Sequence, residues 1–133
     1  MSNRATGTRF EQELCELLAE HGFWAHNLTQ NQAGQPADII AVKGNYAVLI
    51  DCKVCSTNSF RLSRIEENQE MAMLRWYATG NDHSYFALKM LSGEIYMMPS
   101  KWALGQRSCG VKTIRPCDHQ WIPCFWRWAE GFQ

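Results

Sequence analysis

Two acidic residues and a lysine stand at the edge of, or inside, apolar stretches of the sequence, where they could support hydrolytic chemistry. Asp38 opens one apolar run, and Asp51 and Lys53 lie within the next. Residues two apart in a strand project from the same face of a sheet, so Asp51 and Lys53 would share a side. The pattern is compatible with a surface ion pair and a turn-capping Asp38, and equally with part of a catalytic site.

The segment between the two apolar runs favours the catalytic interpretation. Lys43-Gly44-Asn45 is typical of a hairpin turn, and Asp38 and Asp51 are almost equally distant from it along the chain. Two neighbouring carboxylates repel each other, and burying each of them costs free energy. A bound Mg²⁺ would offset both costs, with Mn²⁺ as a substitute, because Mg²⁺ prefers oxygen ligands. The backbone carbonyl of Cys52 could add a third ligand.

Lys53 would then lie beside the metal ion. An amine there could orient or deprotonate an attacking water, or stabilise negative charge on a phosphorus-centred transition state. Two further polar residues strengthen this hypothesis. Glu11 lies at the border of the apolar side of a predicted helix, and Gln69 lies within the apolar side of another. A glutamine in that position needs hydrogen-bond partners, which a site or the backbone could provide.

The elements that must position these residues follow from hydrophobic periodicity and turn signals. Helices are expected at residues 8–21, 64–79 and 99–104, with Ser63 as the cap of the second. Strands are expected at residues 23–28, 37–42, 46–54, 84–90, 94–98 and 111–114. Residues 29–36 read as a polar loop. The order predicts a mixed α/β fold and a single domain over residues 1–133.

Composition limits the class of protein. The chain is 46% hydrophobic and 20% charged, so it can bury a core, and its 13 basic residues balance 13 acidic ones. The net charge of zero therefore gives no indication of a nucleic-acid-binding protein. We find no secretory signal and no apolar run of membrane-spanning length, so we expect no membrane association and a cytoplasmic protein with reduced cysteines.

A second, weaker motif is the C-x-x-C formed by Cys52 and Cys55. Such a pair can bind metal or do redox chemistry. Within a strand, however, residues three apart point to opposite faces, so the two sulfur atoms should diverge. We therefore expect buried or incidental thiols here.

Three stretches together resemble a known family. They are N-R-A-T-G-T-R-F-E at 3–11, P-A-D-I-I-A-V-K-G-N-Y-A-V-L-I-D-C-K at 36–53 and F-R-L-S-R-I-E-E-N-Q at 60–69. The P-A-D and D-C-K pieces resemble the PD-(D/E)xK nuclease core. The three stretches in order resemble RecU-type Holliday junction resolvases of bacteria and their phages, and more distantly the archaeal resolvases. The similarity covers about residues 3–98 and leaves a Trp- and Cys-rich extension over about residues 99–133.

The resemblance implies a restriction-endonuclease-like fold, a mixed β-sheet flanked by helices with an α-β-β-β-α-β core. It implies Mg²⁺-dependent hydrolysis of DNA, giving 5′-phosphate ends, by a homodimer acting on a branched or four-way junction in a bacterial or phage-infected cell. Asp38, Asp51 and Lys53 match the family's two acids and lysine. Glu11 matches its helical acid, also a possible metal ligand, and Gln69 its second-helix glutamine.

The sequence also departs from that family. Asp51 replaces the more usual Glu, and the short segment before Pro36 leaves no obvious room for the RecU stalk that enters a junction. Junction specificity is thus less firmly implied than catalysis. A nuclease of restriction, repair or transposition type, or an inactive DNA-binding module, remains an alternative. The residues predicted to contact DNA phosphates are Arg4, Arg9, Arg61 and Arg64.

Overall fold

A five-stranded sheet forms the centre of the molecule, with strand order β1-β2-β3-β5-β6. The structure is a computed structural model that describes residues 3–28 and 37–132, the side chains of residues 3 and 4 excepted. The predicted loop at 29–36 therefore lies outside the described residues. The strands of the sheet are β1 (Trp24–Asn27), β2 (Ile39–Lys43), β3 (Tyr46–Val54), β5 (Ser84–Lys89) and β6 (Ile95–Pro99).

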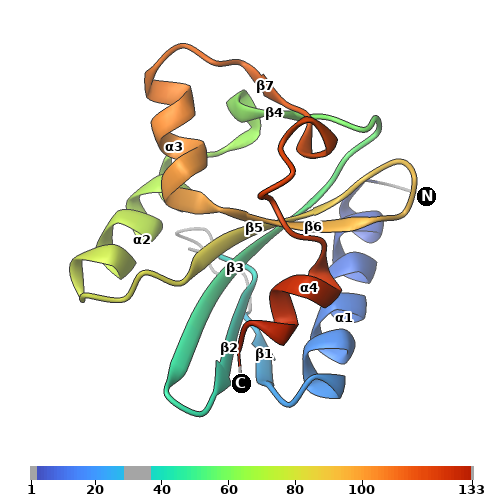
Figure 1. Ribbon diagram of the computed structural model, residues 1–133, viewed down its shortest axis with the longest axis vertical. Helices are drawn as coiled ribbons and strands as arrows, with labels where there is room; N and C mark the ends of the chain where they lie inside the picture. The colour runs from blue at the N-terminus through green and yellow to red at the C-terminus, as the bar shows by residue number, and fades with distance from the viewer. Residues whose placement is uncertain (1–2, 29–36, 133) are drawn as a thin grey trace.

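Helices and a small second sheet complete the fold (Figure 1). Strands β4 (Phe60–Arg61) and β7 (Thr113–Ile114) pair to make the second sheet. The helices are α1 (Asn3–Glu20), α2 (Glu67–Ala78), α3 (Ser100–Ser108) and α4 (Phe125–Glu130), with 3₁₀ turns η1 (Leu62–Arg64) and η2 (Pro116–Asp118).

Strand β3 holds the sheet together because it is hydrogen-bonded on both sides. It pairs antiparallel with β2 through the predicted hairpin and parallel with β5. A parallel partner requires a crossover connection, and α2 lies within it. The predicted mixed α/β fold is thereby confirmed, and the predicted strand at 46–54 has the expected bounds.

Two apolar clusters occupy the two faces of the sheet. Helices α1 and α4 pack on one face through side chains such as Leu14 and Phe125. Helices α2 and α3, with β4 and β7, pack on the other through Met73, Leu104 and Phe60. The sheet is therefore buried on both faces, which fits the long apolar runs of β2 and β3. Among the described residues, no helix is both long and apolar enough to cross a membrane.

Several predicted boundaries were wrong. The helix expected at 64–79 begins at Glu67, because residues 62–64 form a 3₁₀ turn and Ile65 is extended, with ψ near 113°. The helix expected at 8–21 begins earlier, at Asn3, with Gly7 in its interior. The helix expected at 99–104 continues to Ser108.

Candidate active site

The register of β2 and β3 brings the two aspartates together. Ile39 lies opposite Ile50 in the last pair of the two strands, so Asp38 and Asp51 both lie just beyond this pair. The N–H of Asp38 donates to the carbonyl of Ile50 over 3.1 Å, which ties the residue before β2 to β3. The two carboxylates are close enough that the charge of Asp38 raises the pKa of Asp51. Both side chains are buried, with exposed fractions of 7% for Asp38 and 1% for Asp51.

Asp38 is also fixed through its side chain. Its Oδ2 accepts a hydrogen bond of 2.7 Å from the backbone N–H of Cys52. The N–H and C=O of one strand residue point toward the same neighbouring strand. The carbonyl of Cys52 therefore lies on the side of β3 that faces Asp38, at the open end of the hairpin.

Lys53 lies against Asp51, on the same face of β3. Its Nζ is 3.2 Å from Oδ2 of Asp51 and donates to Oε1 of Gln69 over 3.1 Å and to the carbonyl of Arg64 over 3.3 Å. Three oxygen atoms thus surround the Nζ of a side chain that is only 9% exposed. Two of these contacts are hydrogen bonds and the third, to Asp51, is an ion pair, so the amine is held by partners on every side.

Gln69 connects the two charged residues. Its Nε2 donates to Oδ1 of Asp51 over 3.3 Å, and its Oε1 accepts from Lys53. The amide orientation matches its partners, since the carboxylate receives a donor and the ammonium receives an acceptor. The expected need of a buried glutamine for polar partners is met here by Asp51 and Lys53, together with one backbone group.

That backbone group belongs to Glu66, which the sequence reasoning did not select. Glu66 is the N-cap of α2, and its N–H donates to Oε1 of Gln69 over 3.0 Å. In return, the side chain of Glu66 accepts from the backbone N–H of Gln69. This is a capping box with Glu at the cap. The spacing E-x-x-Q at 66–69 was the available signal, and the preference for Ser63 as the cap obscured it.

Glu11, on α1, lies on the side of Asp38. Burial and the charge of Asp38 raise the pKa of Glu11 from 4.5 to about 7, although a hydrogen bond from the Asn27 side chain partly opposes this shift. Asn27, on β1, is a second site residue that the sequence analysis missed. The rise in pKa means that Glu11 lies within electrostatic reach of Asp38.

The acids form an unbalanced cluster of negative charge. Burial, followed by repulsion from Asp38, raises the pKa of Asp51 well above its usual value, although Lys53 opposes the shift. Oδ2 of Asp51 is buried and accepts no hydrogen bond from the described residues, despite the nearby ammonium. A bound divalent cation would suit this cluster, because it stabilises ionised carboxylates and would coordinate Oδ2 of Asp51, which accepts no hydrogen bond from the described residues. Over residues 3–28 and 37–132, however, no three His, Cys, Asp or Glu side chains are already gathered closely enough to hold a metal ion.

The C-x-x-C pair does not form a site. Cys52 packs with the cluster beneath α1, whereas Cys55 packs with the cluster on the opposite face. The predicted divergence of the two sulfur atoms is therefore confirmed. Burial and the surrounding carboxylates raise the pKa of the Cys52 thiol well above its usual value, which disfavours the reactive thiolate form.

A groove of about 650 Å³ lies beside Lys53, walled by the first turns of α1, the end of β3 and η1. Arg61 and Arg64 line it. The guanidinium group of Arg64 donates to the carbonyl of Val54 over 3.0 Å, which fixes its position at the groove. Arg9 is exposed on α1 but does not line the groove, and the Arg4 side chain lies outside the described residues.

The aromatic extension is partly packed against the sheet. Trp128 is 5% exposed and stacks on Phe23, with ring centroids 5.6 Å apart. Phe125 is buried in the same cluster. From the aromatic residues of this segment we expect a packed tail or a dimer contact in preference to stacking on unpaired bases, and packing is confirmed for Phe125 and Trp128. Trp121 and Trp126 are 49% and 56% exposed, so a dimer contact or base stacking by these two side chains stays a prediction.

A central strand that carries an acid and a lysine two residues apart, with a second acid just before the neighbouring strand, matches the arrangement expected for a PD-(D/E)xK nuclease. Comparison with protein families identifies the particular group. Residues 2–115 match the family model described as archaeal Holliday junction resolvase (Hjc). The chain belongs to this family and is a metal-dependent endonuclease that acts on branched DNA.

A solved structure shares the fold. It is that of Archaeoglobus fulgidus Hjc, described as a Holliday junction resolvase from an archaeal hyperthermophile. The two chains superpose with a TM-score of 0.71 at 20% sequence identity, over 92% of this chain and 99% of the other. The predicted restriction-endonuclease-like fold is thereby confirmed. A comparison with curated protein sequences gave no match.

The family result corrects the earlier resemblance in one respect. The prediction of a Holliday junction resolvase is confirmed, but the matching family is the archaeal one, which had been the more distant resemblance, and not RecU. A bacterial or phage origin is therefore not supported. The match also runs to residue 115, beyond the expected end of similarity near residue 98, so α3 and β7 belong to the family pattern.

Proposed function

We propose that this chain resolves four-way DNA junctions by Mg²⁺-dependent hydrolysis of phosphodiester bonds, with Asp38, Asp51 and Lys53 as the central residues. The observation that carries the proposal is the buried link between Asp51 and Lys53 through the amide of Gln69. A structural core has no need of an acid, an amine and an amide joined in this way, because burying such groups costs free energy.

Asp38 and Asp51 would hold the metal ion, with Glu11 and the carbonyl of Cys52 as further oxygen ligands. The chemistry of the donors supports this assignment, since all are hard oxygen ligands of the kind that Mg²⁺ prefers. Mn²⁺ would substitute for it. When bound, the cation would polarise the scissile phosphate and lower the pKa of the attacking water.

Lys53 would stabilise negative charge that develops on the phosphate. Its three contacts with oxygen atoms favour this role over that of a general base, because a base needs an unprotonated nitrogen. Gln69 would hold the ammonium group and the Asp51 carboxylate at a fixed separation. Attack of water on phosphorus would break the bond to the 3′ oxygen and leave a 5′-phosphate and a 3′-hydroxyl.

Arg61 and Arg64 would bind backbone phosphates in the groove beside Lys53, and Arg4 and Arg9 would contact phosphates from the start of α1. A homodimer would place two such sites on a junction of near two-fold symmetry. Residues 1–133 would form one nuclease domain, consistent with the packing of Phe125 and Trp128 against the same sheet as α1.

A substrate panel tests the proposal. The purified protein is incubated with Mg²⁺ and with a linear duplex, a nicked duplex, a flap and a four-way junction of the same sequence. We expect cleavage of the junction to be fastest and to stop when EDTA removes the metal. Cleavage of the linear duplex as fast as the junction would refute junction selectivity and favour a nuclease of another specificity. Analytical ultracentrifugation of the same sample would measure the oligomeric state.

A further inference from the structure

A second groove continues from the first and has a different wall. It has a volume of about 520 Å³ and lies between η1 and the segment that connects α3 to β7. Arg61 and Ser63 line both grooves, so the two adjoin at η1. Its far wall includes Lys112 and Thr113, which belong to the chain beyond the predicted catalytic core.

Main-chain hydrogen bonds fix this far wall to the wall that carries Arg61. Thr113 of β7 pairs with Arg61 of β4. The N–H of Leu62 donates to the carbonyl of Lys112 over 2.9 Å. The side chain of Ile114 is buried in the core, which anchors β7. The second groove is therefore a formed surface and not the gap beside a loose loop.

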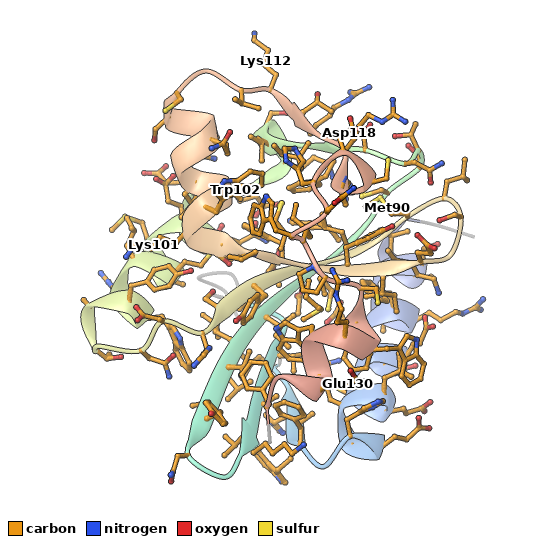
Figure 2. All side chains as sticks on the ribbon, viewed as in Figure 1. Met90, Lys101, Trp102, Lys112, Asp118 and Glu130 are labelled. Atoms are coloured by element: carbon orange, nitrogen blue, oxygen red, sulfur yellow. The ribbon has the colours of Figure 1, made fainter. Side chains whose placement is uncertain are left out.

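The charged side chains that line the two grooves are all basic. Their described lining residues include no Asp or Glu, although the chain as a whole carries as many acidic as basic residues. Within the described part of the chain, neither Arg61 nor Lys112 forms an ion pair, whereas Arg107 is paired with Glu70. Figure 2 shows the Lys112 side chain projecting from the end of the molecule beside β7 into solvent. An acid-free surface with free cations and hydroxyl groups is suited to a polyanion.

From these observations we infer that the second groove binds the phosphodiester backbone of a DNA arm away from the scissile phosphate, through Lys112, Thr113 and Arg61. This inference rests on the proposed function, because it assigns the continuation of the same substrate. It also gives the segment after α3 a role in substrate binding. The ligand is recognised as a chain of phosphates, so the contact would be insensitive to base sequence.

The test is the salt dependence of DNA binding. Fluorescence anisotropy measures the dissociation constant of the full-length protein for a labelled four-way junction, in EDTA so that no cleavage occurs, at a series of salt concentrations. Lys112→Ala should weaken binding by about threefold to tenfold at low salt and reduce the slope of log K against log salt by about 0.9, the value for one phosphate contact. Lys112→Glu should weaken binding further.

Lys101→Ala is the matched control. It removes the same charge from an exposed position at the start of α3 that lines neither groove. Its affinity and salt slope should equal those of the wild type, and thermal unfolding checks that both variants are folded. The inference is overturned if Lys112→Ala and Lys112→Glu behave like Lys101→Ala while the wild type binds and cuts the junction. If the wild type neither binds nor cuts a junction, the proposed function fails and this inference falls with it.

Discussion

Glu66 and Gln69 hold each other in place at the first turn of α2. Each side chain accepts a hydrogen bond from the backbone N–H of the other residue. A capping box usually has only a structural role, because it satisfies free N–H groups at the helix start. Here the same Gln69 amide also contacts Asp51 and Lys53. The helix cap therefore sets the position of the groups proposed to do the chemistry.

Replacing the cap should accordingly affect both stability and catalysis. Glu66→Ala should lower the free energy of unfolding by about 1 kcal/mol, the usual cost of losing an N-cap acceptor. It should also lower kcat severalfold with KM for DNA unchanged, because Gln69 loses one restraint on its amide. Glu66→Asp keeps an acceptor and should recover most of both losses. A stable Glu66→Ala protein with the wild-type kcat would show that the cap is only structural.

Asp51 and Lys53 should be essential for cleavage but not for folding. Asp51→Asn and Lys53→Ala should each abolish detectable Mg²⁺-dependent cleavage of the junction. Asp51→Asn should also raise the thermal midpoint of the metal-free protein, since it removes a buried carboxylate that repels Asp38. Lys89→Ala on β5 breaks an ion pair with Glu13 of α1, serves as a control and should retain cleavage. Activity in either site variant would contradict the mechanism.

The raised pKa of Glu11 makes stability depend on pH in a known direction. Between pH 4.5 and about 7 the folded protein retains a proton that the unfolded chain has released. The raised pKa of Glu11 therefore stabilises the folded state fully below pH 4.5, and this contribution is lost as the pH rises through about 7. Urea unfolding of the metal-free protein should show that the free energy of unfolding declines as the pH rises across this range. The decline should be smaller in Glu11→Gln.

A divalent cation should reverse that decline. Since the ion would bind the carboxylates in their ionised form, added Mg²⁺ should raise the unfolding midpoint more at about pH 8 than at about pH 5. The comparison should be made between the wild type and Asp38→Asn, which lacks one proposed ligand. An equal effect of Mg²⁺ on both proteins would rule out Asp38 as a ligand.

The aromatic extension offers a matched pair for a packing test. Phe125 is 1% exposed in the cluster beneath α1, whereas the adjacent Trp126 is 56% exposed. Phe125→Ala should destabilise the protein by about 3–5 kcal/mol, as is usual for a buried aromatic side chain. Trp126→Ala should change the free energy of unfolding by less than about 0.5 kcal/mol. Denaturant unfolding of the two variants measures both values, and equal effects would contradict the packing described for α4.

The parts of the fold that follow from local sequence signals were predictable. The turn at Gly44 and two apolar runs were enough to predict the hairpin and to place Asp38 beside Asp51, because strand register follows from the turn. The parallel pairing of β3 with β5 has no such local signal, since it depends on contacts between distant segments. Helix α4, with only six residues, is too short for periodicity to reveal.

The close grouping of Asp38, Asp51, Lys53 and Gln69 was predictable for similar reasons, whereas their catalytic role stays a prediction. Asp51 and Lys53 stand out because charges are rare in buried strands, whereas Glu66 is exposed and Asn27 lies in an ordinary short strand. Their importance arises only from what they contact. Ser63 was a reasonable cap by residue type, but Leu62 is fully buried and the carbonyl of Arg64 accepts from Lys53, so the helix begins later.

The central position of β3 has a consequence for the folding of an enzyme that cuts DNA. Asp51 and Lys53 lie on a strand bonded to neighbours on both sides, and such strands open only when the whole domain unfolds. A partly folded chain would therefore lack an assembled site. Nuclease activity would appear only with the completed domain, so an immature or damaged copy would be harmless to the DNA around it.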